Sequence, residues 1–302
     1  MRTTRWGVVF ALIFAGMIAA GQVGKAAVAL PLIQRELGPA MLRAASVEKD
    51  NDLVFSFWGT YMPFGSAAMM LVGAHLDWQI LWIVNGALAL AYAPAILWLA
   101  PEAAPAVRTR GHVRGNVKAV LTSPGPLVIA SAFGVYVFQY FAIIGLFPTL
   151  LVDRMGLSTA AAGTISAIAI ICNGIGNLLA GGLMRLSVPL WTVLAGGFAF
   201  AGVASFGVFA ENLPVAVVAA VACLILAVGG LIPASLFAAT PRVARSANLL
   251  TMALGLIVQA SNIGQLLGVP AMAAWVEHFG WGYAWAVVVA TSGAGIVLRK
   301  RR

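Results

Sequence analysis

Charged residues are scarce in this chain: they make up 9% of its 302 residues, whereas 62% are hydrophobic. A soluble domain has about a quarter of its residues charged, and it cannot bury so large an apolar fraction. The mean hydropathy of +0.97 therefore predicts a polytopic protein surrounded by the lipid bilayer. The formal net charge of +9 does not indicate nucleic-acid binding, because the basic residues fall mostly in short segments between apolar runs.

Groups that carry enzymatic chemistry are also rare. The only cysteines, Cys172 and Cys223, lie inside apolar runs, and we interpret them as small buried side chains rather than a disulfide or a metal site. The sequence has no nucleophile–histidine–acid set, no HExxH zinc motif and no phosphate-binding loop. We therefore expect neither an enzyme nor a bound cofactor.

Long apolar runs dominate the chain instead. A lipid-facing backbone must satisfy its own hydrogen bonds, and about 20 apolar residues in a helix cross the bilayer core. The runs are continuous, unlike the alternating segments of about 10 residues that build membrane barrels. We therefore predict an all-α polytopic membrane helix bundle of about nine transmembrane helices. The predicted spans are residues 7–32, 53–74, 79–100, 126–150, 158–183, 189–210, 213–236, 248–275 and 280–298.

The first run follows two arginines and could be taken for a secretory signal peptide. It continues to residue 32, which is long enough to span the membrane, so we predict an uncleaved first helix. The longest polar interruption, residues 101–125, divides the chain into an N-terminal bundle of three spans (1–100) and a C-terminal bundle of six (126–302).

The charges predict the orientation of the bundle, because basic loops remain in the cytoplasm. The linker carries Arg108, Arg110, Arg114 and Lys118, which indicates a cytoplasmic position. Counting spans from it puts the basic C-terminus inside and four acids outside: Asp77, Asp153, Glu211 and Glu277. We expect a multi-pass protein of the bacterial inner (plasma) membrane with a cytoplasmic C-terminus. The same count puts residues 34–52 inside. Arg2 and Arg5 instead favour a cytoplasmic N-terminus, which would put the segment after the first span outside.

Several segments resemble the major facilitator superfamily of transporters. LPLIQRELG is similar to the end of that family's first helix, and FWGTYMPFGSA with WQILWIVNGALAL resembles its helices five and six. LVDRMGLSTAAAG resembles the turn into helix eight, GGLIPASLFAATPRVA the end of helix ten, and VQASNIGQLLGVPAMAAWVEHFGWGYAW helices eleven and twelve. The residues of these motifs are most similar to those of the cyanate-permease-like branch. On this resemblance, the first half retains family helices one, five and six, and helices two to four are missing.

The resemblance implies transport of a small solute across the membrane by alternating access, with a small anion as one candidate. The loss of three helices leaves a second hypothesis open, a non-transporting remnant or assembly partner derived from such a transporter. A third hypothesis is a homodimer in which the C-terminal bundles of two copies face each other.

Polar side chains within the spans are the candidate substrate-binding residues. Lys25 is the only charge well inside a span, and Gln22 lies one turn away. They could face a cavity and attract an anion, or Lys25 could extend to the interface. We found no acidic residue at mid-membrane depth, which disfavours proton coupling through an acidic relay.

The remaining candidates are uncharged and recur at helical spacing. Each of them could also make an ordinary interhelical hydrogen bond, but as a converging set they favour a central cavity. They are Tyr61, Tyr136, Gln139, Tyr140, Asn173, Asn177, Gln259 and Asn262. In the eighth span, Gln259 and Asn262 form one polar edge, and Ser261 and Gln265 form another.

Overall fold

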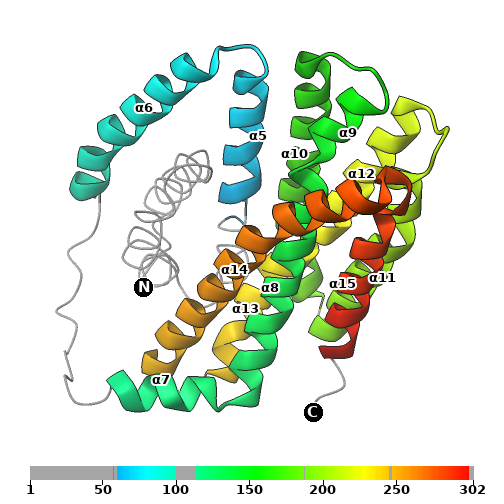
Figure 1. Ribbon diagram of the computed structural model, residues 1–302. Helices are drawn as coiled ribbons and strands as arrows, with labels where there is room; N and C mark the ends of the chain where they lie inside the picture. The colour runs from blue at the N-terminus through cyan, green and yellow to red at the C-terminus, as the bar shows by residue number, and fades with distance from the viewer. Residues whose placement is uncertain (1–56, 58–59, 100–112, 187, 245–246, 299–302) are drawn as a thin grey trace.

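The structure is a computed structural model, and it describes residue 57 and residues 60–99, 113–186, 188–244 and 247–298. These residues form helices joined by short turns, which confirms the predicted all-helical membrane bundle (Figure 1). Five helical segments are long and apolar enough to cross a bilayer: Pro124–Asp153, Thr159–Arg185, Leu190–Phe209, Val215–Val243 and Met252–Phe279. Shorter apolar helices cover Tyr61–Gly73, Gln79–Tyr92 and Trp281–Val297. The predicted first span, with Gln22 and Lys25, lies outside the described residues.

Helices α5 (Tyr61–Gly73) and α6 (Trp78–Leu99) represent the first half of the chain. Helix α5 packs along α10 (Thr159–Arg185) of the second half. Helix α6 diverges from α5 at the turn between them, and Figure 1 shows it running obliquely away from the other helices. Many of its described side chains are exposed, and Leu90 is 78% exposed. Helix α5 is therefore the described element of the first half that borders the C-terminal bundle.

The C-terminal bundle is built around α8 (Pro124–Ile144), which packs on α14 (Ala247–Phe279) and α15 (Trp285–Val297). Helix α10 packs on α12 (Val215–Gly229), and α11 (Leu190–Phe209) lies between α12 and α15. The short helices α9 (Phe147–Asp153) and η2 (Trp281–Tyr283) and helix α13 (Leu231–Val243) complete it. Lipid offers little hydrophobic drive for helix association, so close contacts rely on small residues. A Cβ atom on Gly176 would meet the Ala227 backbone oxygen.

Two predicted spans are each made of two helices. The span predicted at 126–150 breaks at Gly145 and Leu146, between α8 and α9, and Pro148 lies in the first turn of α9. The span predicted at 213–236 breaks at Gly230 and continues as α13 to Val243. A Cβ atom on Gly230 would collide with the Asn173 backbone oxygen, so this glycine lets the junction pass close to α10. The junction at Gly230 thus brings the start of α13 close to Asn173, and both border one cavity.

The linker between the halves is partly helical, which its polar composition did not predict. Helix α7 (Val113–Leu121) lies across the ends of α8 and α14, as Figure 1 shows. Apolar residues recur at Val117, Val120 and Leu121, so one side of the helix is apolar. Val120 is buried, and Lys118 is exposed. This pattern is typical of a helix that lies at the boundary between the bundle and water.

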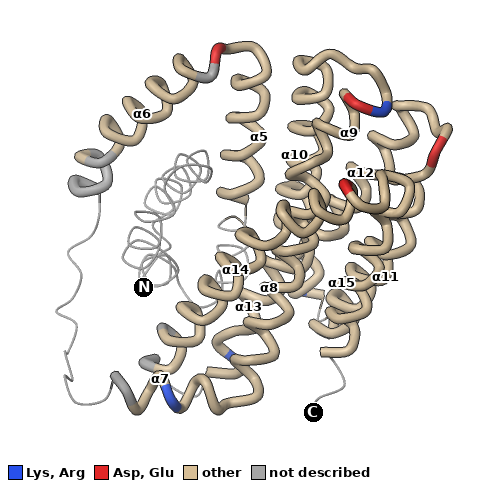
Figure 2. The backbone as a smooth tube through the Cα atoms, viewed as in Figure 1, with Lys and Arg blue, Asp and Glu red and all other residues tan. Residues whose placement is uncertain are grey.

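Charge is segregated between the two ends of the described bundle. Asp77, Asp153, Glu211 and Glu277 lie at or beside the α5–α6, α9–α10, α11–α12 and α14–η2 turns, and Figure 2 shows the acidic positions at one end. At this end the Arg154 guanidinium donates to the Phe209 and Ala210 backbone oxygens at 3.1 and 3.2 Å. These contacts satisfy carbonyl groups where α11 ends.

Candidate functional site

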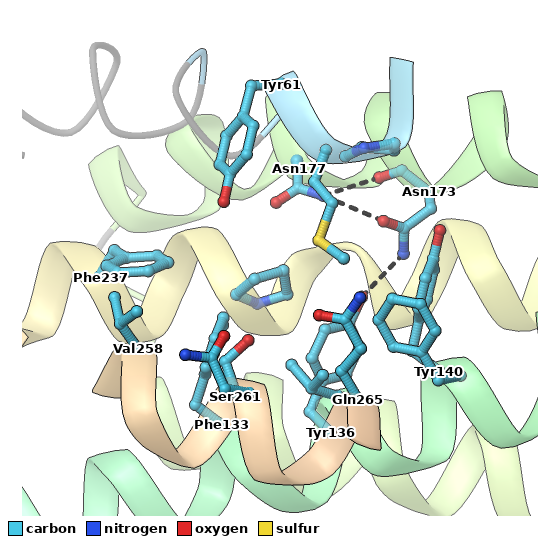
Figure 3. A pocket seen from close by; sticks show the side chains of 16 residues that line it. Tyr61, Phe133, Tyr136, Tyr140, Asn173, Asn177, Phe237, Val258, Ser261 and Gln265 are labelled. Atoms are coloured by element: carbon cyan, nitrogen blue, oxygen red, sulfur yellow. Dashed lines mark hydrogen bonds between the residues drawn. The ribbon is translucent and has the colours of Figure 1, made fainter. Parts of the chain in front are cut away.

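A cavity of about 70 Å³ lies where α5 meets α8, α10, α13 and α14 (Figure 3). It is bordered by one helix of the first half and four of the second. Its polar lining is Tyr61, Tyr136, Tyr140, Asn173, Asn177, Ser261, Asn262 and Gln265. Its apolar lining is Met62, Pro63, Phe133, Val137, Phe141, Pro233, Phe237 and Val258. The described lining contains no charged side chain.

Aromatic side chains of α8 form one wall. Phe133, Tyr136 and Tyr140 follow each other at three- and four-residue spacing, which puts them on one face of the helix. The ring centroids of Phe133 and Tyr136 are 6.2 Å apart, and those of Tyr136 and Tyr140 are 6.1 Å apart. Phe237 of α13 meets Phe133 edge to face at 5.1 Å. The result is a continuous aromatic surface that presents ring faces and two hydroxyl groups.

Two asparagines of α10 form the opposite wall. The Asn173 side-chain amide donates to the Tyr136 hydroxyl and to the Leu226 backbone oxygen, both at 2.9 Å. The Asn177 side-chain amide donates to the Asn173 backbone oxygen at 3.0 Å and to Asn173 Oδ1 at 3.3 Å. Both residues are almost completely buried, at 3% and 1% exposed. The Asn173 amide therefore holds α8, α10 and α12 together, and the Asn177 amide bonds within α10.

Two atoms at the cavity are buried without any such partner. Neither Tyr140 Oη nor Asn177 Oδ1 forms a hydrogen bond within the described part of the chain. An unsatisfied buried polar group costs about 1–3 kcal/mol, and native structures contain few of them. Both residues line the cavity, so a ligand in it would provide the missing partners.

Helix α14 contributes a third wall, which contains only one residue of the polar edge that we selected. Asn262 lines the cavity, together with Ser261 and Gln265. Gln259 is exposed and does not line it. The spacing of Ser261 and Gln265 was visible in the sequence, but polar spacing alone does not reveal how a helix is rotated in a bundle.

Gln139 is also absent from the cavity lining. Its amide donates to the Val288 backbone oxygen at 3.0 Å, the Thr291 hydroxyl at 3.2 Å and the Ser292 hydroxyl at 2.8 Å. All three acceptors belong to α15, so Gln139 joins α8 to α15. The sequence left two roles open for each polar side chain, an interhelical hydrogen bond or a place in a central cavity. Gln139 has the first of these roles.

The structure thus brings together Tyr61, Tyr136, Tyr140, Asn173, Asn177 and Asn262 from the predicted set. Sequence reasoning missed Phe133 and Phe237, because aromatic residues are common throughout apolar helices. It also left out Gln265, which occupies the α14 wall. The described residues contain no cluster of three or more His, Cys, Asp or Glu side chains that could hold a metal ion.

Comparisons with known proteins identify the fold. The family model described as Major Facilitator Superfamily matches residues 6–249. No curated protein matches the sequence. Among solved structures, the human organic anion transporter MFSD10 is similar over 98% of this chain and 77% of its own, with a TM-score of 0.69 and 12% identity.

Two bacterial transporters are similar as well. The E. coli fucose:proton symporter FucP matches 97% of this chain and 81% of its own, with a TM-score of 0.63 and 12% identity. A bacterial homologue of the iron transporter ferroportin, in an outward-facing state, matches 98% of this chain and 83% of its own, with a TM-score of 0.63 and 14% identity. Identities this low establish a shared fold and leave the substrate open.

Proposed function

Because the chain belongs to the Major Facilitator Superfamily, we propose that it moves a small polar solute across the membrane through the cavity bordered by α5, α8, α10, α13 and α14. The family is one of multi-pass membrane transporters, so membrane transport is the function class. The observation that carries the assignment to this cavity is the pair of buried, unpartnered atoms Tyr140 Oη and Asn177 Oδ1. Polar groups that serve only packing are normally paired, as Gln139 is.

The proposed mechanism is alternating access, in which the two halves of the chain rock about the cavity. The contact between α5 and α10 joins the halves in the described structure. It is close at one end, where a Cβ atom on Gly163 would lie 2.7 Å from Ala74 Cβ. In contrast, the α11–α15 contact at Gly202 and Ser292 lies within one half. Rocking would change the first contact and preserve the second.

Two further hypotheses depend on the sequence. A small anion is an alternative solute, which rests on Gln22 and Lys25 outside the described residues. The assignment to the cyanate-permease-like branch and the absence of family helices two to four rest on the motif resemblance. Without those helices, the N-terminal half has fewer helices with which to enclose the cavity. The alternative is then a non-transporting remnant or an assembly partner.

The test uses the purified full chain in liposomes, with Cys172 and Cys223 changed to alanine. Solute entry is followed by stopped-flow light scattering for lactamide, glycerol, lactate and choline. Entry of at least one solute faster than into protein-free vesicles supports transport. Equal rates for all of them favour the non-transporting alternative.

A disulfide pair tests the mechanism. Ala74→Cys with Gly163→Cys would join the two halves, and Gly202→Cys with Ser292→Cys would join α11 to α15 within one half. Oxidation should stop entry in the first variant, and a reductant should restore it. The second variant, as the matched control, should transport in both states. Undiminished transport by the oxidised first variant would contradict alternating access.

A further inference from the structure

We propose that the part of the cavity between Tyr136 and Tyr140 of α8 and Asn173 and Asn177 of α10, here called the recess, recognises an uncharged solute whose groups donate and accept hydrogen bonds, such as a primary amide or a hydroxyl. This inference rests on the proposed function, because it names the class of solute that the same cavity would take. Its basis is the set of donors and acceptors that remain free after the hydrogen bonds between the described residues are counted.

The side-chain N–H groups of the two asparagines of α10 are already used. Asn173 donates its amide protons to the Tyr136 hydroxyl and the Leu226 backbone oxygen. Asn177 donates to the Asn173 backbone and side-chain oxygens. Neither amide therefore has a free N–H group to offer a solute. The Tyr136 oxygen accepts from Asn173, which leaves its own proton available.

The unused groups have opposite hydrogen-bonding roles. Asn177 Oδ1 has no partner and can only accept a hydrogen bond. Tyr140 Oη has no partner and can donate or accept. A solute that meets both atoms must offer an N–H or O–H to Asn177 Oδ1, and at Tyr140 Oη it can either donate or accept. A primary amide and a hydroxyl meet that requirement without a formal charge.

Charged solutes fit the recess less well. A carboxylate has no proton to donate to Asn177 Oδ1, and it would place negative charge near that oxygen's lone pairs. A cation would be buried with no acidic side chain in the described lining, and an unpaired buried charge is costly. The aromatic row of Phe133, Tyr136 and Tyr140 adds ring faces that suit the apolar side of a small neutral molecule.

Binding is tested separately from transport, by thermal unfolding of the purified full chain in detergent. A ligand that binds the folded state raises the midpoint temperature by an amount that grows with the logarithm of its concentration once this exceeds the Kd. The probes are lactamide and lactate, which differ only in the exchange of a primary amide for a carboxylate. Glycerol is the second neutral probe, and choline is the cationic probe.

The informative variant is Tyr140→Phe, since it removes a hydroxyl that makes no described bond and leaves the ring in place. The matched control is Tyr283→Phe, at an exposed residue outside the cavity. We expect lactamide or glycerol to stabilise the protein, with a Kd that is about three- to tenfold higher in Tyr140→Phe and unchanged in Tyr283→Phe.

The outcomes separate the two proposals. Stabilisation by lactate or choline but by neither neutral probe would overturn the uncharged class and leave the transport proposal standing. Stabilisation by a neutral probe that Tyr140→Phe does not weaken would overturn the assignment to this recess, and so would the absence of any stabilisation. Binding of a neutral probe without entry of any solute into liposomes would support the recess and contradict transport.

Discussion

The Asn173 side-chain amide donates a 2.9 Å hydrogen bond to the Tyr136 hydroxyl, joining α10 to α8 beside the cavity. The same amide reaches the Leu226 backbone oxygen of α12, so one side chain connects three helices. This arrangement keeps the aromatic wall and the asparagine wall in register and orients Asn177, which donates to Asn173. The site is thus held by amide N–H groups that are themselves unavailable to a solute.

The energy of this contact can be measured with a double-mutant cycle. We expect Asn173→Leu to lower the free energy of unfolding by about 1–3 kcal/mol, since it removes the donor of the Tyr136 hydroxyl and leaves the Leu226 oxygen with the Gly230 N–H alone. Tyr136→Phe should cost less, because Asn173 retains Leu226 as an acceptor. The coupling energy between the two changes should be about 0.6–1.7 kcal/mol. Unfolding in mixed detergent measures all four proteins, and strictly additive effects would exclude the hydrogen bond.

The two glutamines Gln139 and Gln265 should separate structure from solute binding. Gln139→Leu removes three hydrogen bonds to α15 and should lower the free energy of unfolding by about 1–2 kcal/mol. Gln265→Leu changes a cavity wall and should reduce solute entry while leaving that free energy within about 0.5 kcal/mol. Unfolding curves and liposome entry, measured on both variants, check the pair. Reduced stability in Gln265→Leu, together with reduced solute entry at unchanged stability in Gln139→Leu, would contradict the proposed site.

Close packing of α10 against α12 predicts a position-specific effect of adding one methyl group. Gly176→Ala places a Cβ atom against the Ala227 backbone oxygen and should destabilise the protein by about 1–3 kcal/mol. Gly182→Ala, on the same helix, meets open space and should be neutral or stabilising by up to about 1 kcal/mol. Thermal unfolding of the two variants tests the expectation. Equal stability would mean that α10 and α12 are farther apart than described.

The segregation of charge predicts which end of the bundle faces the cytoplasm. In a background with Cys172 and Cys223 changed to alanine, Glu211→Cys should react with an impermeant thiol reagent on intact cells. Thr122→Cys, near the basic helix α7, should react only after the cells are opened. The reverse labelling pattern would mean that the described bundle has the opposite orientation in the membrane. Ser46→Cys, in the segment between the first two predicted spans, should behave like Thr122→Cys if the count of spans from the linker is right.

The homodimer hypothesis predicts cross-linking through α14. Gln259 is an exposed amide on a face that also carries Ile263 and Leu266, 59% and 72% exposed. A polar side chain within a membrane span favours a protein neighbour over lipid. Gln259→Cys in the same cysteine-free background should then form a disulfide-linked dimer upon oxidation in native membranes. Leu90→Cys on α6 is the control, and dimers at both positions or at neither would contradict a specific α14 interface.

The sequence by itself determined the class of molecule and the places where polar chemistry could occur. The scarcity of charge, the lengths of the apolar runs and the family motifs were enough to predict a helical membrane bundle of the facilitator type. Helical spacing was enough to pair Tyr136 with Tyr140 and Asn173 with Asn177, because a shared face is a property of three or four consecutive residues. The breaks at Gly145 and Gly230 were not predicted, since continuous apolar composition does not reveal where a helix bends.

Only the tertiary structure decided which polar groups remain free for a solute. Gln139 and Asn177 look alike in sequence, but the acceptors that occupy the Gln139 amide come from α15, about 150 residues away in the chain. Gln259 and Gln265 lie on the same helix, and its rotation against α8 determines which one lines the cavity. Hydrogen bonds between distant segments and the rotation of a packed helix depend on several surfaces at once. No local pattern encodes them.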